Sequence, residues 1–325
     1  MRPSIAFALL VLSGLIAFGK AAGTSLAADE KTAAPANKQA VLWQKLESAI
    51  REIDAKLDGV LGVAIMDLTT GQKWSLNGDQ VFPQASSIKI TVLAELYRQS
   101  QEGGAGNAKL SDLYTVRESD LVQDSDVLLG MTPGVTRVTN RDLASFMVSV
   151  SDNSATNVLI DRVGMNNVNK LLDKLGLKNT RLRRKMMDIN AAKEGRENIS
   201  TPNEMMALLE MIYRGKILNK ATTDDFFKIL ATHKDSNLLR GLPDGTKAAT
   251  KPGALEGVRN DSGIVFATNR PFILCIMTTY LRDEKAGERA ISDIAGAAYR
   301  QFDRIGRASE YGRVISTFNS AEEAK

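Results

Sequence analysis

Histidine is almost absent from this chain, since His233 is the only one among 325 residues. A zinc site built from several histidines is therefore excluded. A serine-histidine-aspartate triad would have to use His233, which lies in a polar segment between a helix-like run and a Gly/Pro turn. We expect it to be a solvated loop residue. Any nucleophilic catalysis must then use a lysine or a carboxylate as its base.

Cysteine is equally scarce. Cys275 is the single one, and it falls in the strand-like run 272–280, where we expect a buried, unreactive thiol. A disulfide framework is excluded. A lipid-anchored N-terminus is not supported either, because no cysteine lies near it.

Long hydrophobic runs are missing as well. The apolar run at residues 5–18 contains a serine and a glycine and is too short to span a bilayer comfortably. It follows Arg2 and precedes small residues that end in Ser25-Leu26-Ala27, a pattern typical of a secretory signal cleaved after Ala27. We expect a periplasmic or secreted protein; the alternative is an uncleaved membrane anchor.

Charge of one sign is not in excess. The chain has 42 basic and 38 acidic side chains, a formal net charge of +4, which is too mild to imply nucleic acid. No internal repeat is visible. We expect a monomer whose partner is a small molecule, with no metal.

The hydrophobic periods predict an α+β fold. Strand-like runs lie towards both ends of the chain, with a mostly helical region between them. This order predicts an antiparallel sheet built from N- and C-terminal segments, flanked by helices and carrying an all-α insertion, with the site in the cleft between the two parts. The strand-like runs are 60–68, 73–76, 248–251, 263–268 and 272–281, and the helices flanking them are 39–57 and 288–305.

We divide the chain into a signal peptide, a mobile leader, a catalytic domain and a tail. The boundaries are 1–27, 28–37, 38–308 and 309–325, and the catalytic domain has an α/β part at about 38–85 and 203–308 and a helical part at about 86–202.

A possible nucleophile stands where an apolar helix begins. One helical turn brings the amine of Lys89 beside the hydroxyl of Ser86. Lys89 can act as a base only if burial or a second cation lowers its pKa, and Lys251 is the candidate cation, which would also attract an anionic substrate. The backbone N–H groups of Ser86 and Ala254 could stabilise an oxyanion. The plainer alternative, a helix-capping serine and a solvated lysine, fits poorly with the apolar flanks.

Two further polar motifs follow in order, Ser151-Asp152-Asn153 between two helices and Lys251-Pro252-Gly253 on a strand. Ser151 could relay a proton to a leaving nitrogen, and Asn153 could position Lys89 or a substrate carbonyl. These residue types are also ordinary in loops and caps, but the ordered set of three motifs is hard to obtain by chance.

With these motifs, residues 42–305 resemble the class A β-lactamases and the related penicillin-binding peptidases. Residues 82–89 (FPQASSIK) look like the nucleophile segment of that family, and residues 151–157 (SDNSATN) look like its proton-relay loop. The resemblance implies an α/β domain plus a helical domain with the site between them. It also implies β-lactams or D-alanyl peptides as substrates and no cofactor.

The resemblance fails in the loop that should carry the deacylating glutamate. Met186 stands where the family has that glutamate, Met187 replaces the following proline, and Asn190 matches the family's asparagine. A general-base contribution of ~10² to 10⁴-fold is then absent unless another carboxylate substitutes. The candidates in the same loop are Asp188, which is closest, Glu194 and Glu197.

A second departure is Pro252, which stands where the family has a hydroxyl residue that meets a substrate carboxylate. Arg259 could supply the missing anion contact, or it could be a solvated hairpin arginine. Three hypotheses follow: a serine hydrolase of class A β-lactamase type with slow deacylation, a penicillin-binding D,D-peptidase or transpeptidase, and a β-lactam-binding or sensor protein without turnover.

Overall fold

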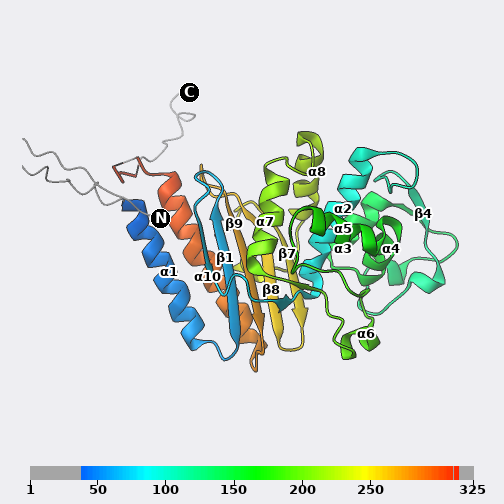
Figure 1. Cartoon of the computed structure of the whole chain (residues 1–325), viewed down its shortest axis with the longest axis horizontal. Helices are drawn as coiled ribbons and strands as arrows, with labels where there is room; N and C mark the ends of the chain where they lie inside the picture. The colour runs from blue at the N-terminus through cyan, green and yellow to red at the C-terminus, as the bar shows by residue number, and fades with distance from the viewer. Residues whose placement is uncertain (1–37, 310, 315–325) are drawn as a thin grey trace, which may run out of the picture. The chain divides into compact units, whose positions relative to one another are not determined.

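A computed structural model describes residues 38–309 and 311–314. The expected signal peptide and leader, and most of the expected tail, lie outside these residues. The described part contains a five-stranded antiparallel sheet with helices on its faces and a group of helices beside it (Figure 1). The predicted α+β class is confirmed. No helix in the described part is long and apolar enough to cross a membrane.

The sheet combines strands from both ends of the described region. Its order is β2-β1-β9-β8-β7, and every neighbouring pair is antiparallel. The N-terminal strand β1 pairs along its whole length with β9, as the prediction requires. The strands are β1 (Val60–Asp67), β2 (Lys73–Leu76), β7 (Ala248–Leu255), β8 (Val258–Val265) and β9 (Phe272–Thr279).

The neighbouring strands β1 and β9 are almost wholly apolar, as expected where both faces of a sheet are covered. One face packs against α1, α9 and α10 and the other against α7 (Figure 1). On the first face Phe302 stacks on Phe272 at 4.3 Å between ring centroids and meets Trp43 edge-on at 5.5 Å. The helices are α1 (Lys38–Lys56), α7 (Pro202–Tyr213), α9 (Asn237–Arg240) and α10 (Glu284–Gly306).

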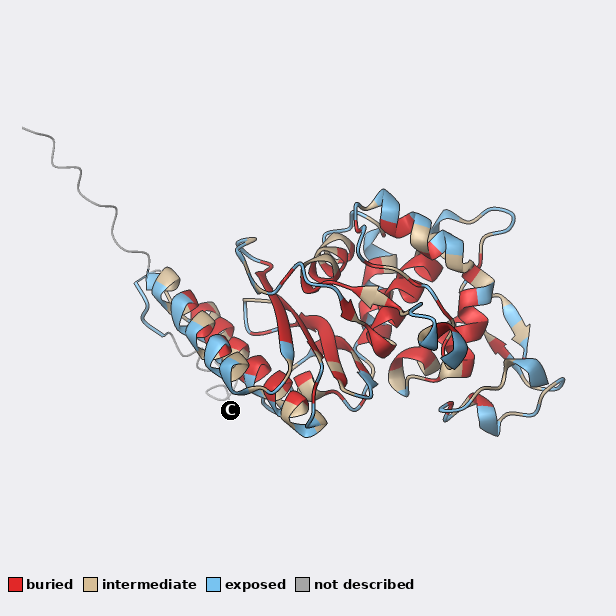
Figure 2. Cartoon of the chain, turned by 60° about the horizontal axis from the view of Figure 1, so that its bottom comes forward, coloured by how far each residue is buried: buried red, intermediate tan, exposed pale blue. Residues whose placement is uncertain are grey.

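The remaining helices form the inserted part, whose buried sides share a core with the α7 face of the sheet (Figure 2). Short 3₁₀ turns and two small strand pairs connect them. The helices are α2 (Lys89–Glu102), α3 (Asn140–Ser149), α4 (Asn153–Val163), α5 (Met165–Lys174), α6 (Ile189–Lys193) and α8 (Lys220–Leu230). The short elements are η1 (Ala85–Ile88), η2 (Glu118–Asp120), η3 (Leu128–Gly130), β3 (Phe82–Pro83), β4 (Leu113–Thr115), β5 (Arg137–Thr139) and β6 (Ile199–Ser200).

Two predicted strands are longer in the structure. β7 continues past Lys251 to Leu255, and β8 begins at Val258 instead of Gly263, because the two strands form one hairpin in which Pro252 pairs with Asp261. Proline is tolerated here because β7 is an edge strand, where a missing N–H breaks no ladder.

Two helical boundaries also differ. α10 begins at Glu284, a turn before the expected start, because Asp283 caps it by accepting from the N–H of Lys285. The loop that follows Met186, for which the sequence predicted no helix, contains the short helix α6.

Candidate active site

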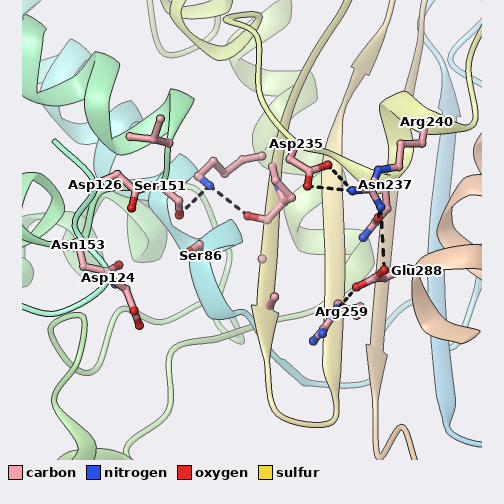
Figure 3. A pocket seen from close by; sticks show the side chains of 15 residues that line it. Ser86, Asp124, Asp126, Ser151, Asn153, Asp235, Asn237, Arg240, Arg259 and Glu288 are labelled. Atoms are coloured by element: carbon pink, nitrogen blue, oxygen red, sulfur yellow. Dashed lines mark hydrogen bonds and ion pairs between the residues drawn. The ribbon is translucent and has the colours of Figure 1, made fainter. Parts of the chain in front are cut away.

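The three polar motifs meet in one cavity of about 440 Å³, called here the main cleft (Figure 3). Ser86 comes from the turn before α2, Ser151 from the α3–α4 connection and Lys251 from the edge strand β7. The cleft is lined by Ser86, Asp124, Asp126, Val150, Ser151, Asn153, Asp235, Asn237, Arg240, Lys251, Pro252, Gly253, Ala254, Arg259 and Glu288.

The turn that carries Ser86 is fixed to the sheet. Ser87 Oγ donates to the Lys251 carbonyl at 3.0 Å, and the Asn260 amide donates to the Pro83 carbonyl at 2.8 Å. Ala85 has a φ of 48°, a left-handed backbone that an alanine adopts only when its surroundings impose it. The nucleophile candidate therefore has a set position relative to β7.

Gly253 allows β7 to come this close. A Cβ atom on Gly253 would lie 2.9 Å from the Ser86 nitrogen, 2.8 Å from the Ser87 nitrogen and 2.7 Å from the Gln84 carbonyl oxygen. Any larger residue would push β7 away from the nucleophile turn. The third motif thus needs its glycine for approach, in addition to its lysine for charge.

Lys89 is fully buried behind the cleft. Its Nζ donates to the Ser151 carbonyl at 2.5 Å, Ser151 Oγ at 3.0 Å and Asn153 Oδ1 at 2.9 Å. Among the described residues no hydrogen bond joins it to Ser86. Burial, and then the charge of Lys251, hold the pKa of Lys89 well below its ordinary value, against the opposing field of Asp152. Lys89 therefore gives up its proton more readily than an exposed lysine, as a base at this position requires.

Ser151 Oγ lies between the two lysines. It receives Lys89 Nζ at 3.0 Å and Lys251 Nζ at 3.1 Å. Burial lowers the pKa of Lys251 to about 7, with Asp261 opposing the shift and Lys234 adding to it. The pKa values of both amines are lowered, and the hydroxyl between them can pass a proton from one partner to another.

Asp152, the middle residue of the second motif, has a structural role. Its Oδ1 accepts from the Ala155 N–H at 2.8 Å and caps α4, and its Oδ2 accepts from the N–H groups of Val127 and Leu128 at 2.9 Å. One buried carboxylate therefore holds the loop 121–128 against the start of α4.

Met186 borders a smaller cavity of about 130 Å³ on the other side of Ser86, called here the loop cavity. The Asn157 side chain fixes its backbone, accepting from the Met186 N–H at 2.8 Å and donating to its carbonyl at 3.0 Å. The loop cavity is lined by Ala85, Ser86, Asp124, Asn153, Arg184, Met186, Met187, Ile189, Asn198, Ala254 and Leu255.

None of the three carboxylates considered as substitutes lines either cavity. Asp188 is exposed and caps α6 by accepting from the Ala191 N–H at 3.0 Å. Glu197 pairs with Arg184 at 3.0 Å, and Glu194 pairs with Arg196. This geometry does not support Asp188 as the deacylating base.

Two residues that were expected to contact the substrate, Asn190 and Arg259, have different surroundings from those expected. Asn190 is exposed on α6 and lines neither cavity. Arg259 lines the main cleft, but its Nε donates to Glu288 at 3.0 Å (Figure 3), and it also pairs with Glu284. Its charge is therefore balanced within the protein. Asn153 and Ala254 line both cavities, as expected of residues near the substrate.

The two scarce residue types lie apart from this site. Cys275 is fully buried in β9, as expected, and burial raises the pKa of its thiol to about 12, which disfavours the reactive thiolate. His233 lies in the loop after α8 and lines neither the main cleft nor the loop cavity.

Sequence reasoning missed several charged residues of the main cleft, above all Asp124 and Asp126 in the loop 121–128 and Asp235 and Arg240 at the opposite wall. None belongs to a recognisable motif. One indirect signal for the loop 121–128 is present in the sequence, namely Asp152. An aspartate at such a position can cap a helix and hold a neighbouring loop.

Comparison with known proteins agrees with this geometry. Residues 45–302 match the model of a family described as the beta-lactamase enzyme family. The chain is similar to Beta-lactamase CARB-3 of Pseudomonas aeruginosa, with 27% identity over 249 residues that cover 75% of this chain and 84% of that enzyme.

Solved structures give the same result. The β-lactamase of Sphaerobacter thermophilus DSM 20745 is similar with a TM-score of 0.72 and 31% identity, over 79% of this chain and 97% of that one. A leucine-to-glutamate mutant of PBP-A, solved as an acyl-enzyme complex with penicillin G, is similar with a TM-score of 0.72 and 25% identity, over 81% of this chain and 97% of that one.

Proposed function

This chain belongs to the beta-lactamase enzyme family, and from that premise we propose that it is an exported serine hydrolase that β-lactams acylate at Ser86 and that deacylates slowly. The observation that carries the proposal is the position of Ser151 Oγ between Lys89 and Lys251 in the cleft that holds Ser86. This arrangement supplies a nucleophile, a neutral amine and a proton relay without a histidine.

In the proposed acylation, Ser86 Oγ attacks the lactam carbonyl carbon and its proton passes to the neutral amine of Lys89. The N–H groups of Ser86 and Ala254 would stabilise the oxyanion that forms. When the carbon–nitrogen bond breaks, Ser151 gives its proton to the ring nitrogen and regains one from the lysines that flank it. Lys251 would also attract an anionic group of the substrate.

Deacylation needs a base that activates water, and the loop cavity holds Met186 where the family has its glutamate. A thioether cannot take a proton, so a contribution of ~10² to 10⁴-fold from a general base is missing. Slow decay of the acyl-enzyme follows.

A second candidate function is a D,D-peptidase or transpeptidase that acts on peptides of the cell wall. Met186 favours it, because this function needs the acylating residues but not the loop glutamate. A third candidate, a binding or sensor protein that keeps its acyl group, differs from both in lacking turnover.

An intact-mass time course with benzylpenicillin tests the proposal. We expect a single penicilloyl adduct that forms faster than it decays, mapping to the peptide that contains Ser86. Exported protein should have the mass of a chain starting at Ala28. An adduct that never decays would favour the sensor function, decay only with D-alanyl peptides as acceptors would favour the peptidase, and absence of any adduct would contradict all three. A mass starting at Met1 would show an uncleaved anchor.

Restoring a carboxylate by Met186→Glu should speed deacylation, by up to ~10²-fold for one general base, and leave acylation nearly unchanged. The Asn157 side chain holds the backbone at this position, so the new carboxylate should enter the loop cavity. Single-turnover kinetics with a chromogenic cephalosporin separate the two steps. Met186→Gln is the matched control, similar in shape but not basic, and an equal gain in that variant would contradict the mechanism.

A further inference from the structure

Asp124 is the carboxylate that the two cavities beside Ser86 share. It lines both the main cleft and the loop cavity, together with Asn153 and Ala254. Its side chain is exposed, and it has no hydrogen-bond or ion-pair partner among the described residues. Among the residues that line the loop cavity, Asp124 is the one carboxylate that a substrate held at Ser86 can meet.

The loop holds Asp124 in a defined place. On its N-terminal side, the Val122 N–H donates to Ser154 Oγ at 2.8 Å. On its C-terminal side, Ser125 Oγ accepts from the Ser154 N–H at 2.8 Å and lies 2.8 Å from Ser154 Oγ. The loop segment that carries Asp124 is thus held against the start of α4, next to Ser151 and Asn153.

The opposite wall of the main cleft offers little free positive charge. Arg259 pairs with Glu284 and Glu288, and Arg240 pairs with Asp235 at 2.6 Å. Figure 3 shows the Arg240–Asp235 and Arg259–Glu288 pairs on one side of Ser86 and Asp124 beside Asn153 on the other. Pro252 also lacks the hydroxyl that could hold a substrate anion. The unbalanced charge on the helical side of the cleft is therefore negative.

We propose that Asp124 determines substrate specificity. It favours substrates that carry an ammonium group on the portion extending past Asn153, and it disfavours substrates that carry a second carboxylate on that portion. This inference rests on the proposed function, since it concerns the rate at which different acyl donors reach Ser86. The interaction is a solvent-exposed pairing of opposite charges, worth about five-fold in rate for each unit of charge.

Three penicillins that differ only in the side-chain substituent test this: benzylpenicillin is neutral, ampicillin adds an amine and carbenicillin adds a carboxylate. The second-order acylation rate constants are measured by intact mass at pH 6.5, where an α-amino group is protonated. We expect ampicillin to react faster than benzylpenicillin, and benzylpenicillin faster than carbenicillin, with the differences shrinking at high salt.

Asp124→Asn should reduce the ratio of the acylation rate constants for ampicillin and carbenicillin by about ten-fold or more, because the variant loses both the attraction for the amine and the repulsion of the carboxylate. The matched control is Asp293→Asn, which removes the same charge from an exposed site on α10 outside the cleft and should keep the ratio. Equal ratios in Asp124→Asn and in the unmodified protein, or a preference for carbenicillin, would overturn this inference alone. Absence of an adduct with all three penicillins would overturn the proposed function and this inference with it.

Discussion

Ser86→Ala is expected to abolish the penicilloyl adduct, because no other hydroxyl combines the required surroundings. Ser86 lies at the junction of the main cleft and the loop cavity, and Gly253 brings the edge strand against its backbone nitrogen. Loss of a nucleophilic serine costs about 10⁶-fold in well-studied serine enzymes. Intact-mass measurement after overnight exposure to benzylpenicillin checks the result.

The neighbouring serine provides the control for this variant. Ser87 is buried, and its Oγ donates to the Lys251 carbonyl at 3.0 Å instead of facing the cleft. Ser87→Ala should slow acylation through a looser turn but keep the adduct on Ser86. If Ser86→Ala acquires the adduct at the normal rate, the assignment of the nucleophile is wrong.

Lys89→Met should slow acylation by ~10² to 10⁴-fold, the contribution of a general base. Methionine is close in length to the lysine and suits a fully buried position, so the loss should come from the missing amine. The Ser151 carbonyl and Asn153 Oδ1 lose their donor as well, so the melting temperature must be measured to show that the variant is folded. A fully folded Lys89→Met protein that acylates at the normal rate would exclude Lys89 as the base.

The pH dependence gives a second readout for the same variant. The pKa of Lys89 is well below its ordinary value, so acylation in the unmodified protein should rise with pH as Lys89 loses its proton. Lys251 has a pKa of about 7, so its charge, and the attraction for an anionic substrate, should be lost as the pH rises past that value. The profile should be bell-shaped, and Lys89→Met should lose the rising limb.

The sequence allowed the local parts of this site to be predicted, because each motif is a contiguous segment with its own chemistry. A lysine one helical turn after Ser86 is expected on the same face of the helix, whereas the close approach that Gly253 permits was not predicted and is seen only in the fold. The predicted sheet of N- and C-terminal strands is confirmed for a similar reason, since apolar runs of strand length can be recognised one at a time.

Interactions between distant segments could not be read in this way. Arg259 was considered as an anion contact, and only the fold shows that Glu284 and Glu288 of α10 balance it. Asp124 could not be found at all, because its place beside Ser86 depends on how Ser154 and Asp152 hold its loop. Asn190 matches the family in sequence position, yet it is exposed on α6 and lines neither cavity.

The clamp between Asn157 and the backbone of Met186 also bears on how this protein could evolve. Because the clamp contacts only main-chain atoms of position 186, natural selection can exchange the side chain there without rebuilding the loop. The genetic code nevertheless makes the exchange from methionine to glutamate a two-step change, because both the first and the second bases of the codon must change. The intermediates are valine, which cannot take a proton, and lysine, which would add a third amine to a site already set by the balance between Lys89 and Lys251. If Met186 limits turnover as proposed, a lineage carrying it would have to pass through a substitution without benefit before it gained rapid turnover, although the backbone of the loop would not have to change.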